Sequence, residues 1–272
     1  MPKPTLKAPQ KPVEEQLTDS FPLFLSLVWK SLDLPSPTRA QLAIAQYLQN
    51  GPKRLQIQAF RGLGKSWIAA AFVLWTLWID RDKKILVISA SKQRADDFTI
   101  FCQKCILEFD WLAHLRPVDD DQRWSRVSFD VAGCKPAQAP SVKSVGITGQ
   151  ITGSRADLIV FDDVEVPANS ATDFMREKLL QLVTEGESVL TPKNDSRIVF
   201  LGTPQTTFTI YRTLRERNYR PFVWPARYPK DLTGYDEVLA PQLVRDLKRD
   251  GHETLSWSPT DTRFSEINLL ER

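Results

Sequence analysis

A short stretch of the chain, LQIQAFRGLGKSWIAA, has the residue types of a phosphate-binding loop. It ends in Gly64-Lys65-Ser66, but the glycine expected five positions before Gly64 is Ala59, and Arg61 lies inside the loop. A strand entering such a loop and a helix leaving it aim backbone N–H groups and the positive helix end at a phosphate. Lys65 would reach the β- and γ-phosphates, and the Ser66 hydroxyl would bind Mg²⁺. The alternative is a glycine-containing turn without a ligand.

A second signal is LIVFDD at 158–163, in which four apolar residues precede Asp162 and Asp163. The apolar residues predict a central strand, and open α/β sheets bind ligands at the carboxyl ends of their strands. Asp162 would hold Mg²⁺ through water, and Asp163 or Glu165 would orient the attacking water. Alone, the motif could be a strand followed by an acidic turn. Together with the loop, it favours a hydrolase of nucleoside triphosphates.

Three further polar residues are candidates for nucleotide contacts. The apolar run IVFLGTPQT ends with Thr203 and Gln205, where a small polar residue could sense the γ-phosphate; a simple turn with proline is the alternative. Gln41 follows a Pro-Thr turn and could hydrogen-bond an adenine, or it could be a surface helix residue. The predicted nucleotide contacts are therefore Gln41, Ala59, Phe60, Gly62, Leu63, Gly64, Lys65, Ser66, Thr203 and Gln205.

Short apolar runs alternate with amphipathic segments along the chain, which predicts an α/β fold. Strands are expected at 54–60, 84–89, 126–131, 141–147, 156–163, 196–204 and 220–226. Helices are expected from Phe21, between a cap at Thr38 and a stop at Gly51, and at 65–79, 91–109 and 175–190. This order favours a mainly parallel sheet with helices on both faces.

Composition limits the remaining possibilities. The chain has 272 residues, is 42% apolar, and carries a formal charge of only +3, so a nucleic-acid contact would have to be local. The longest apolar run, at 67–79, has 13 residues, whereas a membrane helix needs about 20. The odd number of cysteines argues against a disulfide framework and for a reducing environment. We expect a flexible arm at 1–20, one globular domain at 21–230, and a linker or tail at 231–272.

Some groupings of reactive residues are weaker signals. A zinc site made from Cys102, Cys105, Cys134 and His114 is disfavoured, because the first two fall within a helix and no second close pair completes the set. The acidic run at 119–121 is expected to be a solvated turn. Lys92 and Arg94 could contact DNA phosphates, or they could simply begin a solvated helix.

Several motifs, in this order, resemble the large terminase subunit of tailed bacteriophages, especially the T7-like group. The resemblance covers roughly residues 20–270. It is carried by the loop at 56–66, ILVISASKQRAD (85–96), PSVKSVGITGQITGSRADLIVFDDVEVPANSAT (140–172), RIVFLGTPQT (197–206) and WPARYP (224–229). The run at 140–172 is the most specific of these.

The resemblance implies a DNA-packaging motor. Its N-terminal domain would be a three-layer P-loop ATPase of the additional-strand, catalytic-glutamate (ASCE, RecA-like) class that uses ATP and Mg²⁺. It would drive double-stranded DNA through a portal protein into a procapsid, with a small terminase subunit and as a homo-oligomeric ring, expected to be a pentamer. It would act in the cytoplasm of the infected bacterial host, without a membrane. The chain ends at Arg272, about where a nuclease domain would begin in this family, so nuclease carboxylates are not expected in it.

The same resemblance assigns roles to two arginines. Relatives often carry an arginine at the position of Arg61, which is thought to act on the γ-phosphate within its own subunit. Arg155 in TGSRAD is a candidate finger toward a neighbouring subunit, or a surface loop residue. Many relatives follow the magnesium aspartate with glutamate, whereas this chain has Asp163, with Glu165 as the second candidate for the catalytic acid.

Two other functions remain open at this stage. A free-standing helicase-like translocase would share the loop, the acids and Gln41, but it needs a second RecA-like half. An assembly module would bind nucleotide with little hydrolysis.

Overall fold

A computed structural model gives the structure of the chain and describes residues 11–118, 122–205, 208–229, 231–235 and 237–250. Its centre is a seven-stranded sheet in the order β3-β4-β2-β5-β6-β1-β7. The strands are β1 (Arg54–Ala59), β2 (Ile85–Ser89), β3 (Ser128–Phe129), β4 (Val142–Gly146), β5 (Leu158–Asp162), β6 (Arg197–Gly202) and β7 (Arg220–Trp224). Neighbours are parallel except β3, which pairs antiparallel with β4. The predicted mainly parallel sheet is confirmed.

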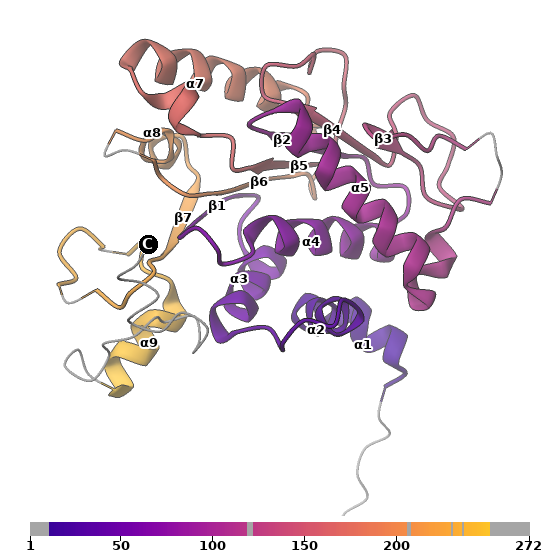
Figure 1. Cartoon of the computed structure of the whole chain (residues 1–272), viewed down its shortest axis with the longest axis horizontal. Coiled ribbons are helices and arrows are strands. Elements are labelled where there is room, and N and C mark those ends of the chain that lie inside the picture. The colour runs from indigo at the N-terminus through magenta and orange to yellow at the C-terminus, as the bar shows by residue number, and fades with distance from the viewer. Residues whose placement is uncertain (1–10, 119–121, 206–207, 230, 236, 251–272) are drawn as a thin grey trace, which may run out of the picture.

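The central strands are apolar throughout because both faces of the sheet are covered. Along β5, Val160 packs into one core and Phe161 into the other, where its ring stacks on Phe200 at a centroid distance of 4.1 Å. The main covering helices are α3 (Arg39–Asn50), α4 (Lys65–Ile79) and α5 (Lys92–Glu108) on one face, and α7 (Asp173–Ser188) and α8 (Ile210–Glu216) on the other. Figure 1 shows the two groups on opposite sides of the strands. The three-layer α/β architecture is therefore confirmed.

The strand order decides the class of the sheet. The strand before the phosphate loop, β1, is separated from the acid-bearing β5 by one additional strand, β6. All three run in the same direction, so their carboxyl ends meet at one edge of the sheet. This arrangement is that of the additional-strand P-loop class, and it brings the loop, the acids and the Thr203 turn to the same edge.

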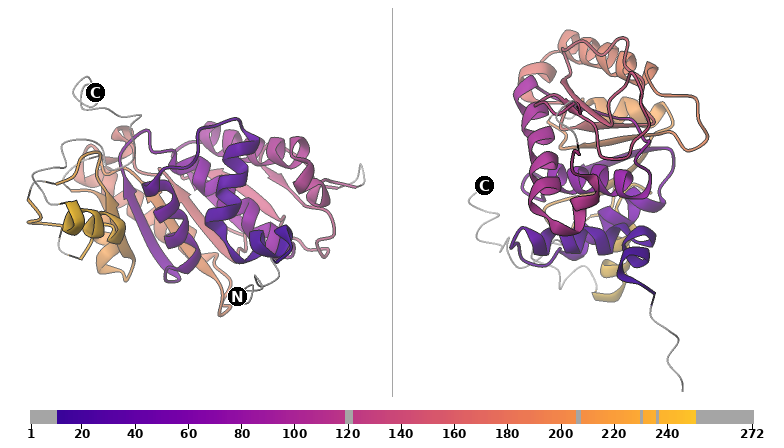
Figure 2. Two further views of the ribbon diagram at one scale, coloured as in Figure 1. Left: turned by 90° about the horizontal axis from the view of Figure 1, so that it is seen from below. Right: turned by 90° about the vertical axis from the view of Figure 1, so that its right-hand side faces the viewer.

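Helix α4 is buried on nearly all sides, which explains its continuous apolar sequence. The sheet lies on one side, and α1 (Val13–Asp19) and α2 (Phe21–Ser31) pack on the other. Figure 2 shows these helices, in indigo and purple, crossing the sheet. Within the described residues, no helix is both long and apolar enough to span a membrane.

The prediction of a flexible arm at 1–20 is wrong for its second half. Helix α1 buries Leu17, and the indole of Trp75 donates a hydrogen bond of 2.9 Å to the Leu17 carbonyl. The Pro- and Lys-rich composition hid this contact, because it depends on a helix almost sixty positions away in the sequence. Residues 1–10 lie outside the described residues.

The expected tail also begins too early. Helix α9 (Pro241–Asp250) buries Leu243 and Leu247, and Arg39 forms an ion pair with Asp246. Domain packing therefore continues past residue 230, and the end of the predicted tail, 251–272, lies outside the described residues. The remaining short helices are η1 (Asp110–Leu115) and α6 (Pro167–Ser170).

Candidate nucleotide-binding site

The phosphate loop turns sharply between β1 and α4. Gly62 and Gly64 have φ values of 99° and 83°, a backbone region that favours glycine. Helix α4 begins at Lys65, directly after Gly64. The loop therefore presents the unpaired N–H groups of the first helical turn, and the positive helix end, to the space above it.

The ammonium of Lys65 is held inside the loop. It donates to the carbonyl oxygens of Ala59 (3.0 Å) and Phe60 (3.2 Å) and to Thr203 Oγ1 (2.8 Å). Burial lowers the pKa of Lys65, an effect that the charges of Asp163 and Asp162 oppose. The lysine is thus fixed at the base of the loop, as a phosphate ligand requires.

Ser66 and Asp162 form the candidate magnesium site. The Ser66 hydroxyl donates to Asp162 Oδ1 at 3.0 Å, which joins the first turn of α4 to the end of β5. Burial raises the pKa of Asp162 to about 6, although the hydrogen bond from Ser66 lowers it. A buried carboxylate beside a hydroxyl oxygen is a donor set that suits Mg²⁺, which binds through one or two protein oxygens, water and substrate phosphates.

This buried carboxylate should make stability depend on pH in a specific way. Its pKa is raised in the folded state, so burial of the charged form costs stability above about pH 6, and the cost disappears below the unfolded value of 3.8. In metal-free buffer, the free energy of unfolding of the wild type relative to Asp162→Asn should therefore rise by about 3 kcal/mol as the pH falls through this window. Denaturant titrations of both proteins measure the difference; a difference that falls toward acid pH would contradict it.

Asp163 faces the same space from a constrained backbone position. Its φ is +48°, and its N–H donates to the Leu201 carbonyl at 2.8 Å. Its side-chain Oδ1 accepts the Thr203 N–H at 3.1 Å. One carboxylate oxygen is thus used to position the acid, which lies beside Asp162 along the edge of the site.

The structure places Glu165 in a different role from the one considered above. Its carboxylate is buried and accepts from the N–H groups of Gln205 and Ile210 and from the Thr209 hydroxyl, at 2.7–3.0 Å. Through these hydrogen bonds, Glu165 links the turn after β6 to the start of α8. A carboxylate with these partners has no free oxygen for an attacking water, which favours Asp163 as the catalytic acid.

Of the two polar residues predicted after β6, only Thr203 reaches the loop. Its hydroxyl accepts from Lys65 and donates to the Ala59 carbonyl at 2.9 Å. Gln205 instead donates its side-chain amide to the Thr203 carbonyl at 2.8 Å. Thr203 therefore connects the tip of β6 to the phosphate loop, and Gln205 supports that turn.

Gln41 lies next to the loop, but its amide is already engaged. It forms a capping box with Thr38 at the start of α3, and its Nε2 donates to the Leu63 carbonyl at 2.9 Å. The predicted helix boundaries at Thr38 and Gly51 are confirmed. In this structure Gln41 supports the loop through its hydrogen bond to Leu63. A contact with an adenine would have to form in addition to this bond and the capping box.

A cavity of about 420 Å³ opens in front of these groups. Its lining consists of phosphate-loop and acid-strand residues together with the first turns of α5, namely Arg61, Ser66, Trp67, Arg94, Asp97, Phe98, Phe101, Asp162 and Asp163. Sequence reasoning identified Arg61 but missed Arg94 as a residue of this site. The sequence offered one indication of this position: α5 follows β2, and β2 lies next to the acid-bearing strand β5.

Comparison with known proteins identifies the family of the chain. Residues 57–197, about half of the chain, match the family model "Terminase large subunit, T4likevirus-type, N-terminal". The chain belongs to this family. It is also 51% identical over 267 residues to the terminase large subunit of Enterobacteria phage T3. The aligned region covers 96% of this chain and 45% of the phage T3 protein, so the chain spans less than half of that relative's length.

Solved structures similar to this terminase domain include a DEAD-box helicase bound to ssRNA and UDP-BeF, with a TM-score of 0.50 and 12% identity, covering 80% of this chain and 46% of the helicase chain. Similarity at this level concerns the fold and supports the RecA-like class. The large terminase ATPase domain of Thermus phage P74-26 is similar over 81% of this chain and 88% of its own, with 12% identity and a TM-score of 0.48.

In the terminase fold seen here, Arg155 lies far from the chain's own phosphate loop. It precedes β5, whereas Asp162 ends this parallel strand, so the two residues occupy opposite edges of the sheet. Arg155 is exposed and donates only to the Ser154 carbonyl among the described residues. A role in catalysis would therefore require a neighbouring copy.

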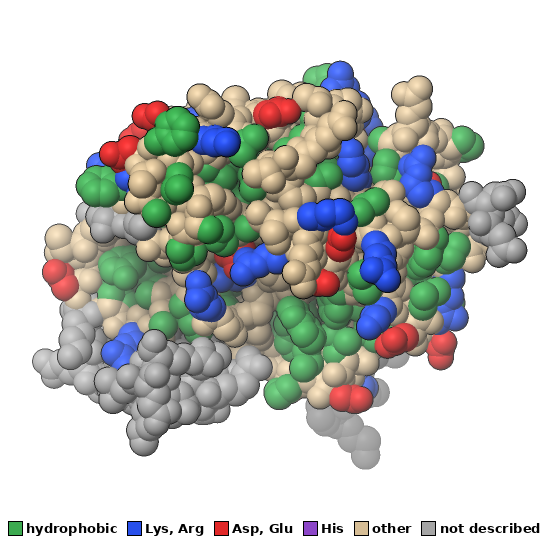
Figure 3. All heavy atoms as spheres, turned by 45° about the horizontal axis from the view of Figure 1, so that its top comes forward, with side chains coloured by type: hydrophobic (Ala, Val, Ile, Leu, Met, Phe, Trp, Pro, Cys, Tyr) green, Lys and Arg blue, Asp and Glu red, His purple; other side chains and the backbone are tan. Residues whose placement is uncertain are grey.

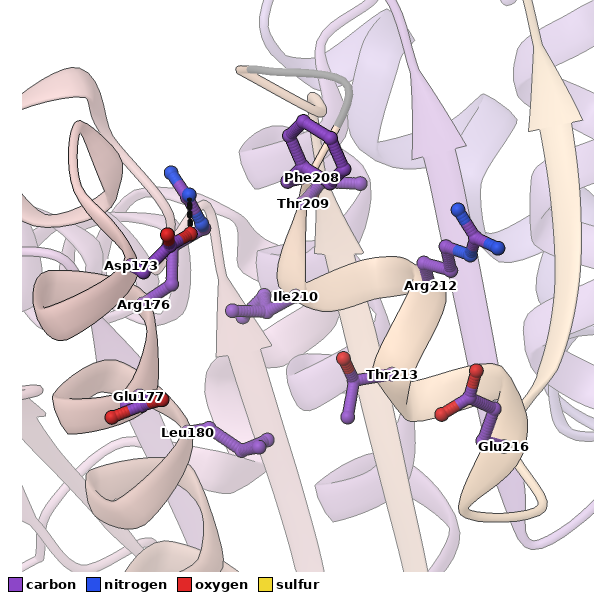
Figure 4. Close-up of a pocket in the computed structure, with 10 residues that line it drawn as sticks. All are labelled: Asp173, Arg176, Glu177, Leu180, Phe208, Thr209, Ile210, Arg212, Thr213 and Glu216. Atoms are coloured by element: carbon purple, nitrogen blue, oxygen red, sulfur yellow. Dashed lines mark hydrogen bonds and ion pairs between the residues drawn. The ribbon is translucent and has the colours of Figure 1, made fainter.

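A second cavity and a pair of cysteines in the terminase domain do not line the nucleotide-binding cavity. A cavity of about 380 Å³ between α7 and α8 contains no predicted site residue, as Figure 4 shows. Cys102 and Cys105 are buried in α5, and burial raises the pKa of both thiols. In the part of the chain that the structure describes, no three His, Cys, Asp or Glu side chains gather as a metal cage would require.

Proposed function

We propose that this chain is the ATP-hydrolysing motor domain of a terminase large subunit, which powers the movement of double-stranded DNA into a procapsid. The observation that carries the proposal is that Lys65, Ser66, Asp162 and Asp163 converge at one sheet edge. The identity of 51% to the phage T3 large subunit supports the packaging role. Portal protein, small terminase subunit and a pentameric ring of this chain are the partners that this function implies, in the cytoplasm of an infected bacterium.

The mechanism follows from what each side chain can do. Lys65 and the loop N–H groups bind the phosphates, and Ser66 and Asp162 would hold Mg²⁺, which neutralises charge on the phosphate oxygens when bound. Asp163, whose position is fixed by Thr203, accepts a proton from the attacking water. Arg61 lines the cavity from the loop and would stabilise the negative charge that develops on the transferred phosphoryl group.

Phosphate release from Mg-ATP tests this function directly. We expect slow release by the chain alone and faster release when duplex DNA and portal-bearing procapsids are added. ATP binding without phosphate release, even with procapsids and DNA, would instead support a nucleotide-binding assembly module. Unwinding of a forked duplex by the chain alone would support a helicase.

The choice of catalytic acid can be tested with two isosteric substitutions. Asp163→Asn should lower the rate of hydrolysis about a hundredfold, because the amide still accepts the Thr203 N–H but cannot take a proton. Glu165→Gln should leave the rate of the folded protein within about threefold and lower the free energy of unfolding by about 2 kcal/mol, because charge-assisted hydrogen bonds are lost. Single-turnover kinetics and denaturant titrations separate the effects; the reverse pattern would assign catalysis to Glu165.

A further inference from the structure

The first turn of α5 lies directly beside the magnesium-site carboxylate. In the pairing of β2 with β5, Ser89 is opposite Asp162, and α5 begins three residues later at Lys92. Ser91 caps this helix by accepting the Arg94 N–H at 3.3 Å. The backbone of Arg94 is thus anchored at the same sheet edge as the phosphate loop, in the first turn of a helix whose positive end faces that edge.

Among the residues that the structure describes, no partner explains the position of the Arg94 side chain. It is exposed, it lines the cavity with Arg61, and in the described ranges it forms neither a hydrogen bond nor an ion pair. By contrast, its neighbour Lys92 pairs with Asp96 at 2.5 Å and does not line the cavity. Burial raises the pKa of Asp162, and the charge of Arg94 acts on that carboxyl in the opposite direction, which agrees with the placement of Arg94 in the site.

Arg61 and Arg94 reach the same cavity from different elements. Arg61 comes from the loop between β1 and α4, and Arg94 comes from α5, with Ser66 and Asp162 also in the lining. On the face shown in Figure 3, Lys and Arg side chains gather around a few acidic ones near the middle of the molecule. A terminal phosphoryl group has several oxygens that gain charge during transfer, so it can use guanidinium groups from two sides.

We propose that Arg94 is a second catalytic arginine of this site, which donates to the terminal phosphate of ATP from the α5 side, opposite Arg61. This inference rests on the proposed ATPase function. A contact of Arg94 with the DNA backbone is less favoured, because Asp97, Asp162 and Asp163 line the same cavity and would repel a duplex. A nucleotide that arrives with Mg²⁺ brings positive charge to those carboxylates.

The test compares binding of Mg-ADP with binding of Mg-ADP plus aluminium fluoride, which mimics the phosphoryl group during transfer. In Arg94→Ala, we expect ADP affinity to stay within about threefold of the wild type. The tightening caused by aluminium fluoride should fall about a hundredfold, and single-turnover hydrolysis should fall by a similar factor. Arg94→Lys should restore part of the tightening and part of the hydrolysis rate, because lysine returns the positive charge without the planar guanidinium.

Lys92→Ala is the matched control, since it removes a positive charge from the same helical turn outside the cavity, and it should behave as the wild type. If the wild type shows no aluminium fluoride complex, the ATPase proposal fails and this inference fails with it. If the wild type forms the complex and Arg94→Ala forms it equally well, only the role of Arg94 is overturned. Weakened duplex binding with an unchanged complex would likewise overturn it and assign Arg94 to DNA.

Discussion

Replacing Lys65 with alanine is expected to lower single-turnover ATP hydrolysis by about a thousandfold. The ammonium is buried at the base of the loop, whereas Arg61, the other cation of the loop, is exposed and lines the cavity. Quenched-flow measurement of phosphate release, with enzyme in excess of ATP, isolates the chemical step from assembly.

The substitution also removes three hydrogen bonds, so its effect on the fold must be measured separately. Circular dichroism and a denaturant titration should show a folded protein with a free energy of unfolding lower by about 1–2 kcal/mol. Lys92→Ala, which removes an exposed lysine from the start of α5, serves as the control with unchanged turnover. Hydrolysis by folded Lys65→Ala at the wild-type rate would refute the nucleotide site proposed here.

Arg61→Ala is expected to cause the second large loss, also about a thousandfold in single-turnover hydrolysis. The side chain is exposed in the cavity and has no hydrogen bond or ion pair among the described residues, so stability should change by less than about 0.5 kcal/mol. The loss should appear at protein concentrations where the chain is monomeric, because the loop places Arg61 in its own site. Rapid-mixing kinetics over a range of protein concentration measures this.

Arg155→Ala provides the matching comparison from the opposite sheet edge. It should leave the monomer's rate unchanged and reduce the rate only when procapsid and DNA assemble several copies, if Arg155 serves a neighbouring site. A monomer rate that falls for Arg155→Ala but not for Arg61→Ala would reverse the two assignments.

Ala59 stands where a phosphate loop usually has its first glycine, and the structure shows why alanine fits there. Ala59 is the last residue of β1, where its backbone pairs with Trp224 in β7 and does not have a positive φ. Lys65 contacts Ala59 through the backbone carbonyl oxygen, which any residue supplies, so the position needs no glycine. The two glycines that the turn does require, Gly62 and Gly64, are both present.

The strands and the position of the acids could be predicted because they depend on local patterns. Apolar runs of strand length set β1, β5 and β6, and parallel strands must end at one edge. Glu165 and Arg94 could not be assigned in this way. The partners of Glu165 lie about forty residues further along, and the cavity beside Arg94 exists only once α5 has packed against the sheet.

The hydrogen bonds of Lys65 carry one more consequence. An ammonium has three protons, and all three have protein acceptors in the loop and at Thr203. A phosphate oxygen that binds Lys65 must therefore replace one of them, so nucleotide binding is an exchange rather than an addition. The net affinity is smaller by the bond that is given up, and this bond reforms when the phosphate leaves. Thr203 is the only side-chain acceptor among the three, so an exchange of its hydrogen bond would act on the tip of β6. After hydrolysis, the protein acceptors compete with the product phosphate for the ammonium of Lys65.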